Sequence, residues 1–197
     1  MSRQIAIQDI PESLIYEMVD GKPIYYKGYQ DVLNGNKHLE EIMSDSNIQA
    51  FLKMYIGNFL INFLKNKYIV TGGEHGLWFR KKSWRAADLA IFFIENFEWT
   101  NHCSKKAPEV VIEIDTKADL DNIGDFIGYF DEKNQQLLKF GVKKIIWIFT
   151  DSEKINIVDH NGKRETFLWT DDISVIDDCK LNIQKIIDDA PFSKNEK

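Results

Sequence analysis

The sequence predicts an α/β domain in which a mixed β-sheet is flanked by helices. Strongly apolar runs at 89–94, 110–114 and 145–149 are typical of buried strands. Apolar residues recur at three- and four-residue steps across 48–64, as they do along one face of a helix. A helical stretch from about 119 to 140 separates the last two strands. Strand, helix, strand in that order predicts a parallel pair joined by a right-handed crossover.

The composition fits one domain rather than several. The chain has 197 residues, of which 44% are hydrophobic and 28% charged, so it can bury a core of its own. We expect a single domain over 1–192 and a disordered polar tail over 193–197. A net charge of −6 argues against nonspecific binding of nucleic acid over a broad basic surface, although it allows a local basic groove.

The two cysteines, Cys103 and Cys179, lie far apart and have no spacing typical of zinc. We expect free thiols in a reducing, cytoplasmic environment. The first ten residues lack the apolar core of a signal peptide, and no apolar run reaches the roughly 18 residues that span a bilayer. No membrane partner is expected.

The N-terminal third predicts a hairpin and then a long helix. Residues 14–19 and 23–26 form the two strands around an Asp20-Gly21 turn. Residues 28–40, rich in glycine and asparagine, indicate a loop. Ser44 to Asn47 supply N-cap candidates for the helix that follows, whose apolar stripe belongs to the core.

The middle of the chain predicts further strands. Residues 68–70 are a short apolar run that ends at a Gly72-Gly73 turn, and 78–82 form a strand with a basic end. The strand carrying Asp88 follows, and a polar connection over 96–106 leads to the strand at 109–114.

The C-terminal part continues with alternating elements. The helix over 119–140 is expected in one piece, or in two pieces broken near Gly124 or Gly128, with Gly141 after its end. The strand at 145–149 has no polar alternation, so both of its faces should be covered. Two closing features then complete the chain, a hairpin at 154–159 and 164–169 and a short strand with a helix over 173–187.

Two acids in apolar strands are the strongest functional signal. If the strands of Asp88 and Glu113 are neighbours, two carboxylates about 4 Å apart would repel by ~4 kcal/mol at an effective dielectric near 20. A divalent cation or a shared proton would offset this repulsion. Pairing with Arg85 or Lys133 would also account for Glu113, because a lone buried carboxylate is costly.

These features carry a family resemblance. Asp88 opens one strand, Ala107 to Glu113 form the next, and Phe140 to Trp147 hold a Gly-Val turn followed by an apolar strand. This order resembles the PD-(D/E)XK nuclease superfamily and is most similar to its Uma2-like group of endonucleases. The resemblance implies a restriction-endonuclease-like sheet with an N-terminal hairpin and long helix, and Mg²⁺- or Mn²⁺-dependent hydrolysis of DNA phosphodiesters.

The resemblance also implies a site, position by position. Asp88 stands at the motif's first acid, with Ala87 in place of proline, and Glu113 stands at the second. Both would be metal ligands that activate the attacking water. Asp115 occupies the motif's lysine position and is either a further metal ligand or a strand-end acid.

The catalytic lysine must therefore come from elsewhere. Lys133, eight residues before the Gly141-Val142 turn, is the first choice, and Lys117, just past the strand end, is a close rival. Such a lysine would orient or help deprotonate water and stabilise charge on the phosphate. Without the resemblance, both would be ordinary solvated lysines.

The sequence leaves the roles of two further groups of polar residues undecided. An extra polar ligand could come from the start of the long helix, where surface capping explains the candidates equally well: Glu40, Glu41, Asp45 and Gln49. The basic cluster of Arg80 to Lys82 with Arg85, beside Trp78 and Trp84, suits either nucleic-acid contact or solvated strand ends.

The leading hypothesis is a metal-dependent endonuclease acting on DNA, and a homodimer is expected by analogy. The alternative is a degenerate nuclease fold that serves as a binding or assembly module. The four histidines lie in loops without an i, i+4 partner, which disfavours a histidine-based metal site.

Overall fold

Most strands of the protein belong to one sheet. The structure, a computed structural model, describes residues 10–119 and 126–191. Its helices and strands are β1 (Ile15–Val19), β2 (Lys22–Tyr25), α1 (Tyr29–Leu33), α2 (Leu39–Met43), α3 (Asn47–Leu64), β3 (Tyr68–Arg80), β4 (Ser83–Phe93), β5 (Val110–Ile114), α4 (Phe126–Phe140), β6 (Lys144–Phe149), β7 (Lys154–Asp159), β8 (Arg164–Leu168), β9 (Ile173–Ile176), β10 (Cys179–Leu181) and α5 (Ile183–Asp188), with short 3₁₀ turns at Glu12–Leu14 and Ile94–Asn96. Within the described ranges the main sheet has the order β2-β1-β4-β5-β6-β7-β8, with β3 paired to β4. The β5–β6 pair is parallel and the other pairs are antiparallel, so the predicted mixed sheet and crossover are confirmed.

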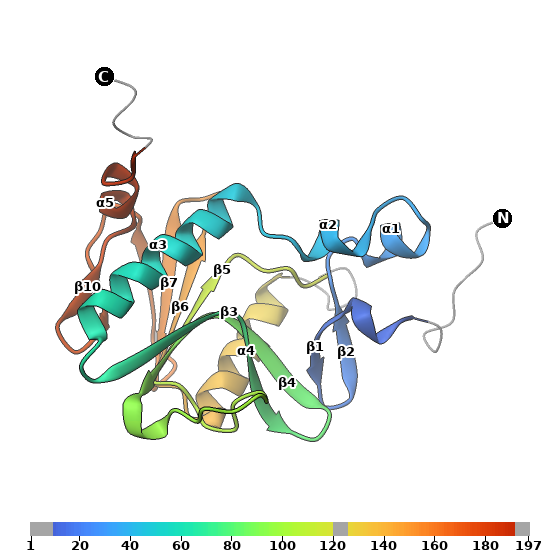
Figure 1. Cartoon of the computed structure of the whole chain (residues 1–197), viewed down its shortest axis with the longest axis horizontal. Coiled ribbons are helices and arrows are strands. Elements are labelled where there is room, and N and C mark those ends of the chain that lie inside the picture. The colour runs from blue at the N-terminus through green and yellow to red at the C-terminus, as the bar shows by residue number, and fades with distance from the viewer. Residues whose placement is uncertain (1–9, 120–125, 192–197) are drawn as a thin grey trace.

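Helices cover both faces of this sheet (Figure 1). Because strand residues alternate between faces, Leu89 and Ile91 pack toward α3 while Ala90 and Phe92 belong to the cluster under α4. The β6 strand is buried on both faces, as predicted from its lack of alternation. A long helix on one face and a shorter one on the other therefore enclose the centre of the sheet.

The predicted long helix forms with its expected cap. The Ser46 side chain accepts a hydrogen bond from the Gln49 backbone N–H, and the Gln49 side-chain oxygen accepts one from the Ser46 backbone N–H. The buried side of α3 is made of leucine and isoleucine: Leu52, Ile56, Leu60 and Leu64.

Four local predictions were wrong. The segment 28–40 is not a loop throughout, because it holds α1 and the start of α2. Residues 68–80 form one strand, and Gly72 and Gly73 lie at a bulge rather than a turn. A Cβ on Gly72 would lie 2.9 Å from Leu89 Cδ2, so this glycine is needed for close packing of β3 on β4.

The other two corrections concern α3 and the C-terminal segment. The apolar stripe of α3 does not all belong to the core, because Ile48, Tyr55 and Phe63 are exposed. Helix α4 continues unbroken through Gly128, and Gly124 lies outside the described residues. The closing segment contains a second hairpin, β9–β10, before α5.

Both cysteines are free thiols, as expected. Burial, with a smaller contribution from Asp178, raises the pKa of Cys179 to about 11, whereas Cys103 is exposed. No helix in the described ranges is both long and apolar enough to cross a membrane.

Candidate active site

The two predicted acids lie where neighbouring strands separate. The β4–β5 ladder pairs residues 89–91 with 110–112. Beyond Leu89 and Ile112, β4 turns toward β1, which it meets at Trp84, while β5 continues beside β6. Asp88 and Glu113 are the next residues on either side of this split.

Asp88 bridges the split with its own side chain. Its Oδ2 accepts a hydrogen bond of 2.6 Å from the Ile114 backbone, which replaces the ladder bond that the diverging strands no longer make. Its Oδ1 lies 2.7 Å from Lys53 Nζ on α3. Burial raises the pKa of Asp88, and Lys53 opposes that rise.

Glu113 shares a buried lysine with a second glutamate. Lys133 Nζ, on α4, lies 3.0 Å from Glu113 Oε2 and 2.9 Å from Glu17 Oε1 on β1. Lys133 and Glu17 are 0% exposed and Glu113 is 2% exposed. This ammonium is therefore fixed between two carboxylates rather than solvated.

The buried charges shift one another's pKa values. Burial raises the pKa of Glu113 well above its usual range; Lys133 opposes the rise and Asp88 adds to it. Burial alone would lower the pKa of Lys133, but Glu113 and Glu17 raise it. Glu113 thus takes up a proton more readily than an exposed glutamate, while Lys133 stays charged.

Glu17 connects this site to a buried arginine. Its carboxylate accepts hydrogen bonds from the Arg85 guanidinium at 2.6 Å, the Tyr129 hydroxyl at 2.9 Å and the Ala86 backbone at 3.1 Å. Burial would raise the pKa of Glu17, but Lys133 and Arg85 lower it below its usual value. Glu17 therefore stays ionised and holds Lys133 in place.

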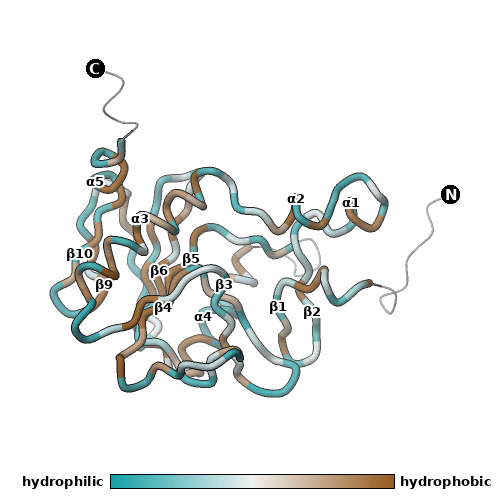
Figure 2. Tube along the Cα trace, in the orientation of Figure 1, coloured by the Kyte–Doolittle hydropathy of each residue, from teal (hydrophilic) through white to brown (hydrophobic). Residues whose placement is uncertain are grey.

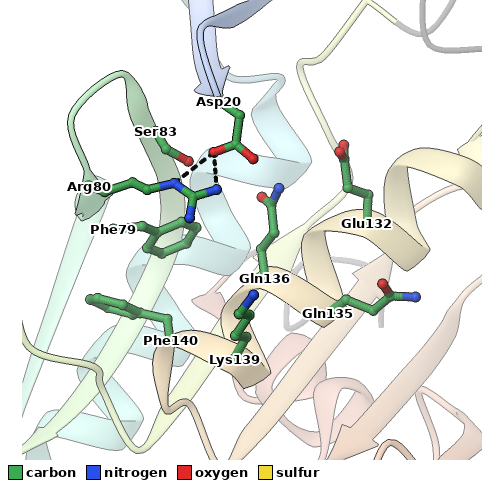
Figure 3. A pocket seen from close by; sticks show the side chains of 9 residues that line it. All are labelled: Asp20, Phe79, Arg80, Ser83, Glu132, Gln135, Gln136, Lys139 and Phe140. Carbon is green, nitrogen blue, oxygen red and sulfur yellow. Dashed lines mark hydrogen bonds and ion pairs between the residues drawn. The ribbon is translucent and has the colours of Figure 1, made fainter.

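Arg85 also contacts two α4 residues that line a cavity between α4 and the end of β3 (Figure 3). Its guanidinium donates to Gln136 Oε1 at 2.8 Å and lies 3.2 Å from Glu132 Oε2. Both residues line this cavity of about 490 Å³, together with Arg80, which pairs with Asp20. Because Arg85 is buried, the predicted basic surface cluster does not include it.

Lys117 lies in a separate group of charges near the start of α3. Its Nζ is 2.9 Å from Asp45 Oδ1 and 3.0 Å from Glu74 Oε1, and it donates to the Met43 carbonyl. Lys53 pairs with the same two acids, because its Nζ lies 2.8 Å from Asp45 Oδ1 and 3.5 Å from Glu74 Oε1. Lys53 thus links this group to Asp88.

Asp115 has its own partners. Its backbone adopts a left-handed φ of 56°, a conformation that costs a non-glycine residue about 1–3 kcal/mol. Its two carboxylate oxygens accept bonds from the Thr150 backbone at 2.9 Å and the Thr150 hydroxyl at 2.7 Å. These bonds fasten the end of β5 to the end of β6.

Of the polar residues near the start of α3, Asp45 is the one that joins the charged group. The Glu41 carboxylate accepts a hydrogen bond from the backbone N–H of His38, the residue before α2. The Gln49 side-chain nitrogen lies 3.4 Å from Asp115 Oδ2. Glu40 forms no ion pair with the site lysines in the described ranges. Those lysines pair instead with Asp45, Glu74, Asp88, Glu17 and Glu113.

Three site residues were missed by the sequence analysis. Glu17 lies in an apolar strand as Glu113 does, so the same criterion could have found it. Lys53 is the one charged residue in the sequence of α3, a signal that an analysis of the apolar stripe overlooked. Glu74 has a left-handed φ of 60° beside the Gly72-Gly73 bulge, which no sequence pattern indicated.

The acids are not arranged as a ready-made metal centre. In residues 10–119 and 126–191, no three Asp, Glu, His or Cys side chains surround one point closely enough to hold an ion. Two carboxylate oxygens of these site acids are nevertheless buried without a hydrogen-bond partner, Glu113 Oε1 and Glu74 Oε2. Such orphaned acceptors are costly unless a cation or proton satisfies them, so the donor set suits a hard divalent cation.

Comparison with solved structures supports the fold. No family model matches this chain, and no curated protein matches it. Among solved structures, it is similar to the crystal structure of a putative nuclease belonging to DUF820 from Anabaena variabilis, with a TM-score of 0.63 and 14% identity. The similarity covers 86% of this chain and 88% of the other. The nuclease-type α/β fold implied by the sequence resemblance is therefore confirmed.

Proposed function

We propose that this protein is a Mg²⁺- or Mn²⁺-dependent endonuclease that hydrolyses phosphodiester bonds of DNA. The observation that carries the proposal is the position of Asp88 and Glu113, each the next residue beyond the last pair of the β4–β5 ladder, with the Asp88 charge raising the pKa of Glu113 and Lys133 beside Glu113. Two carboxylates and a fixed ammonium are the groups that hydrolysis at a phosphate needs. The fold shared with a nuclease of the DUF820 group supports this reading as analogy.

Asp88 and Glu113 would hold the cation, and Glu74 is the nearest further acid, since its charge raises the pKa of Asp88. The unpartnered oxygens of Glu113 and Glu74 would gain a partner. A bound divalent cation supplies Lewis acidity toward the phosphate and lowers the pKa of water. The positive charge of the cation would favour the ionised carboxylates. It would therefore oppose the effect of burial, which raises the pKa values of Asp88 and Glu113.

Lys133 is the lysine we assign to catalysis. Its 3.0 Å contact with Glu113 puts a positive charge where negative charge would build on the phosphate. Glu17 and Arg85 fix its position, so little reorganisation is needed during the reaction. Lys117, bonded to Asp45, Glu74 and the Met43 carbonyl, is assigned to holding the α2–α3 connection over the site.

One observation favours the alternative of a degenerate binding module. Lys53 and Lys133 already neutralise Asp88 and Glu113, so the acids have partners without a metal. In an enzyme, the cation must compete with the Lys53 ammonium for Asp88. The two functions therefore differ first in whether a divalent cation binds at all.

Calorimetric titration with Mg²⁺ and Mn²⁺ tests this point. The wild type should bind one cation, and Glu113→Gln should lower the affinity at least ~10-fold because it removes a charged ligand. Asp115→Asn should leave the affinity within a factor of about 3, because both Asp115 oxygens are bonded to Thr150.

The matched control is Asp20→Asn, which removes an equal charge from an exposed pair with Arg80. Its affinity should equal that of the wild type. If no heat of binding is seen with either cation, the enzyme proposal fails and the binding module is favoured. A large loss in Asp115→Asn would instead make Asp115 a ligand.

A further inference from the structure

The outer side of α3 is unusual for a surface helix, because it has no charge. Among its 18 residues only Lys53 is charged, and this side chain points inward to Asp88. Five large hydrophobic residues of α3 are instead exposed: Ile48 by 53%, Met54 by 71%, Tyr55 by 39%, Ile61 by 51% and Phe63 by 48%. A helix that is apolar on all sides is normally covered on all sides.

Helix α5 lies beside α3 and extends this surface (Figure 1), and Figure 2 marks hydrophobic segments in both helices. Two hollows of about 480 and 460 Å³ lie between them. The first is lined by Tyr55, Asn58, Phe59, Asn62, Phe63, Ile186 and Asp189, and the second by Asn47, Ile48, Phe51, Leu52, Trp169 and Ile187. We call these residues, with the exposed hydrophobic residues of α3, the α3–α5 face.

The aromatic residues of this face form two packed pairs. Phe51 and Tyr55 stack with ring centroids 4.2 Å apart, and Phe59 and Phe63 lie 6.1 Å apart. Such rigid side chains lose little conformational entropy when a partner covers them. They are therefore suited to act as the central anchors of an interface.

The polar residues among them can also be covered at low cost. Asn62 Nδ2 donates to the Asn58 carbonyl at 2.9 Å and to Asn58 Oδ1 at 3.1 Å. Because these groups already pair with each other, a partner need not replace many water contacts. Asp189 is the one charged residue among the described residues that line the two hollows, so the lining is otherwise uncharged.

We propose that the α3–α5 face is a homodimer interface, covered by the same face of a second copy of this chain. In a two-fold interface the same patch of each copy faces the other. Any charged residue at the centre of the patch would therefore face the identical charge of the second copy. A face without central charge avoids that repulsion, whereas a charged partner would gain nothing there.

The size of the face agrees with this occupant. Large hydrophobic side chains carry on the order of 200 Å² each, and the five on α3 are about half exposed, so they alone offer on the order of 500 Å², to which the lining of the two hollows beside α5 adds. Each partner of a standard interface buries ~800 Å². The proposal is independent of the nuclease assignment, because no residue of the face belongs to the acid site.

Sedimentation velocity over a wide concentration range tests the proposal. The wild type should have twice the 23.0 kDa mass of the chain at high concentration. Tyr55→Glu puts a pair of like charges into the interface and should raise the dimer Kd by roughly 100-fold or more. Asn58→Lys, at an exposed position, should have a similar effect without touching the core.

The matched control is Ile127→Glu, which charges a hydrophobic residue of α4 that is 66% exposed and should leave the dimer intact. A wild type that stays monomeric at every concentration would overturn the proposal. So would a dimer that persists in both Tyr55→Glu and Asn58→Lys, because the interface would then lie elsewhere. Circular dichroism on each variant confirms that the fold is retained.

Discussion

Replacing Arg85 with methionine is expected to lower the free energy of unfolding by about 3–5 kcal/mol. Arg85 is 0% exposed, and its guanidinium lies 2.6 Å from Glu17 Oε2, which is equally buried. Methionine fills a similar volume but leaves the Glu17 carboxylate with one cation, Lys133, instead of two. The loss is large because the remaining charge cannot reach water.

Urea denaturation followed by tryptophan fluorescence measures this loss. The control is Arg80→Met, which breaks an exposed pair with Asp20 and should change stability far less, because water screens that pair. Equal effects of the two substitutions would contradict the account, because the interior charges would then be no more important than those on the surface.

Replacing Lys133 with methionine is expected to reduce the rate of DNA cleavage by roughly 10²–10⁴-fold. Lys117→Met should reduce it by less than ~10-fold, since Lys117 pairs with Asp45 and Glu74 and has no contact with Glu113 in the described structure. Single-turnover cleavage of a labelled duplex under saturating Mg²⁺ measures both rates.

Lys133→Met also leaves Glu17 and Glu113 without their shared cation, so a loss of fold must be separated from a loss of chemistry. The double variant Glu17→Gln/Lys133→Met removes one charge of each sign. It should recover much of the stability lost in Lys133→Met and remain inactive. If the double variant regains cleavage, or if Lys117→Met is the more damaging change, Lys133 is not the catalytic lysine.

The parts of the fold that sequence reasoning predicted well are those with a strong hydrophobic pattern. The stripe at 48–64 and the apolar runs of β4, β5 and β6 are long enough that burial decides their structure. Helices α1 and α2 have five residues each, too few to show a period, and their neighbouring glycine and asparagine residues favoured a loop.

The bulge in β3 shows a limit of another kind. Gly72-Gly73 is a good turn signal, yet at this position the chain needs glycine because β4 approaches too closely for a side chain. Glu74 reaches the site because of that bulge. Its role therefore depends on tertiary packing, which local sequence does not encode.

The candidate site was partly predictable for a simple energetic reason. Asp88 and Glu113 stood out because a carboxylate in an apolar strand needs a partner. Their actual partners, Lys53 and Lys133, come from helices 35 residues earlier and 20 residues later in the sequence. Only the packing of α3 and α4 on opposite faces of the sheet shows that these lysines meet the acids.

The most direct test of the central claim is a plasmid-nicking assay on the wild type and on the double variant Asp88→Asn/Glu113→Gln. The account predicts that the wild type converts supercoiled DNA to nicked or linear forms only with Mg²⁺ or Mn²⁺, and that the double variant leaves it supercoiled. A wild type that binds the cation and DNA but never cleaves, or a double variant that cleaves at the wild-type rate, would contradict the assignment of these two acids to catalysis.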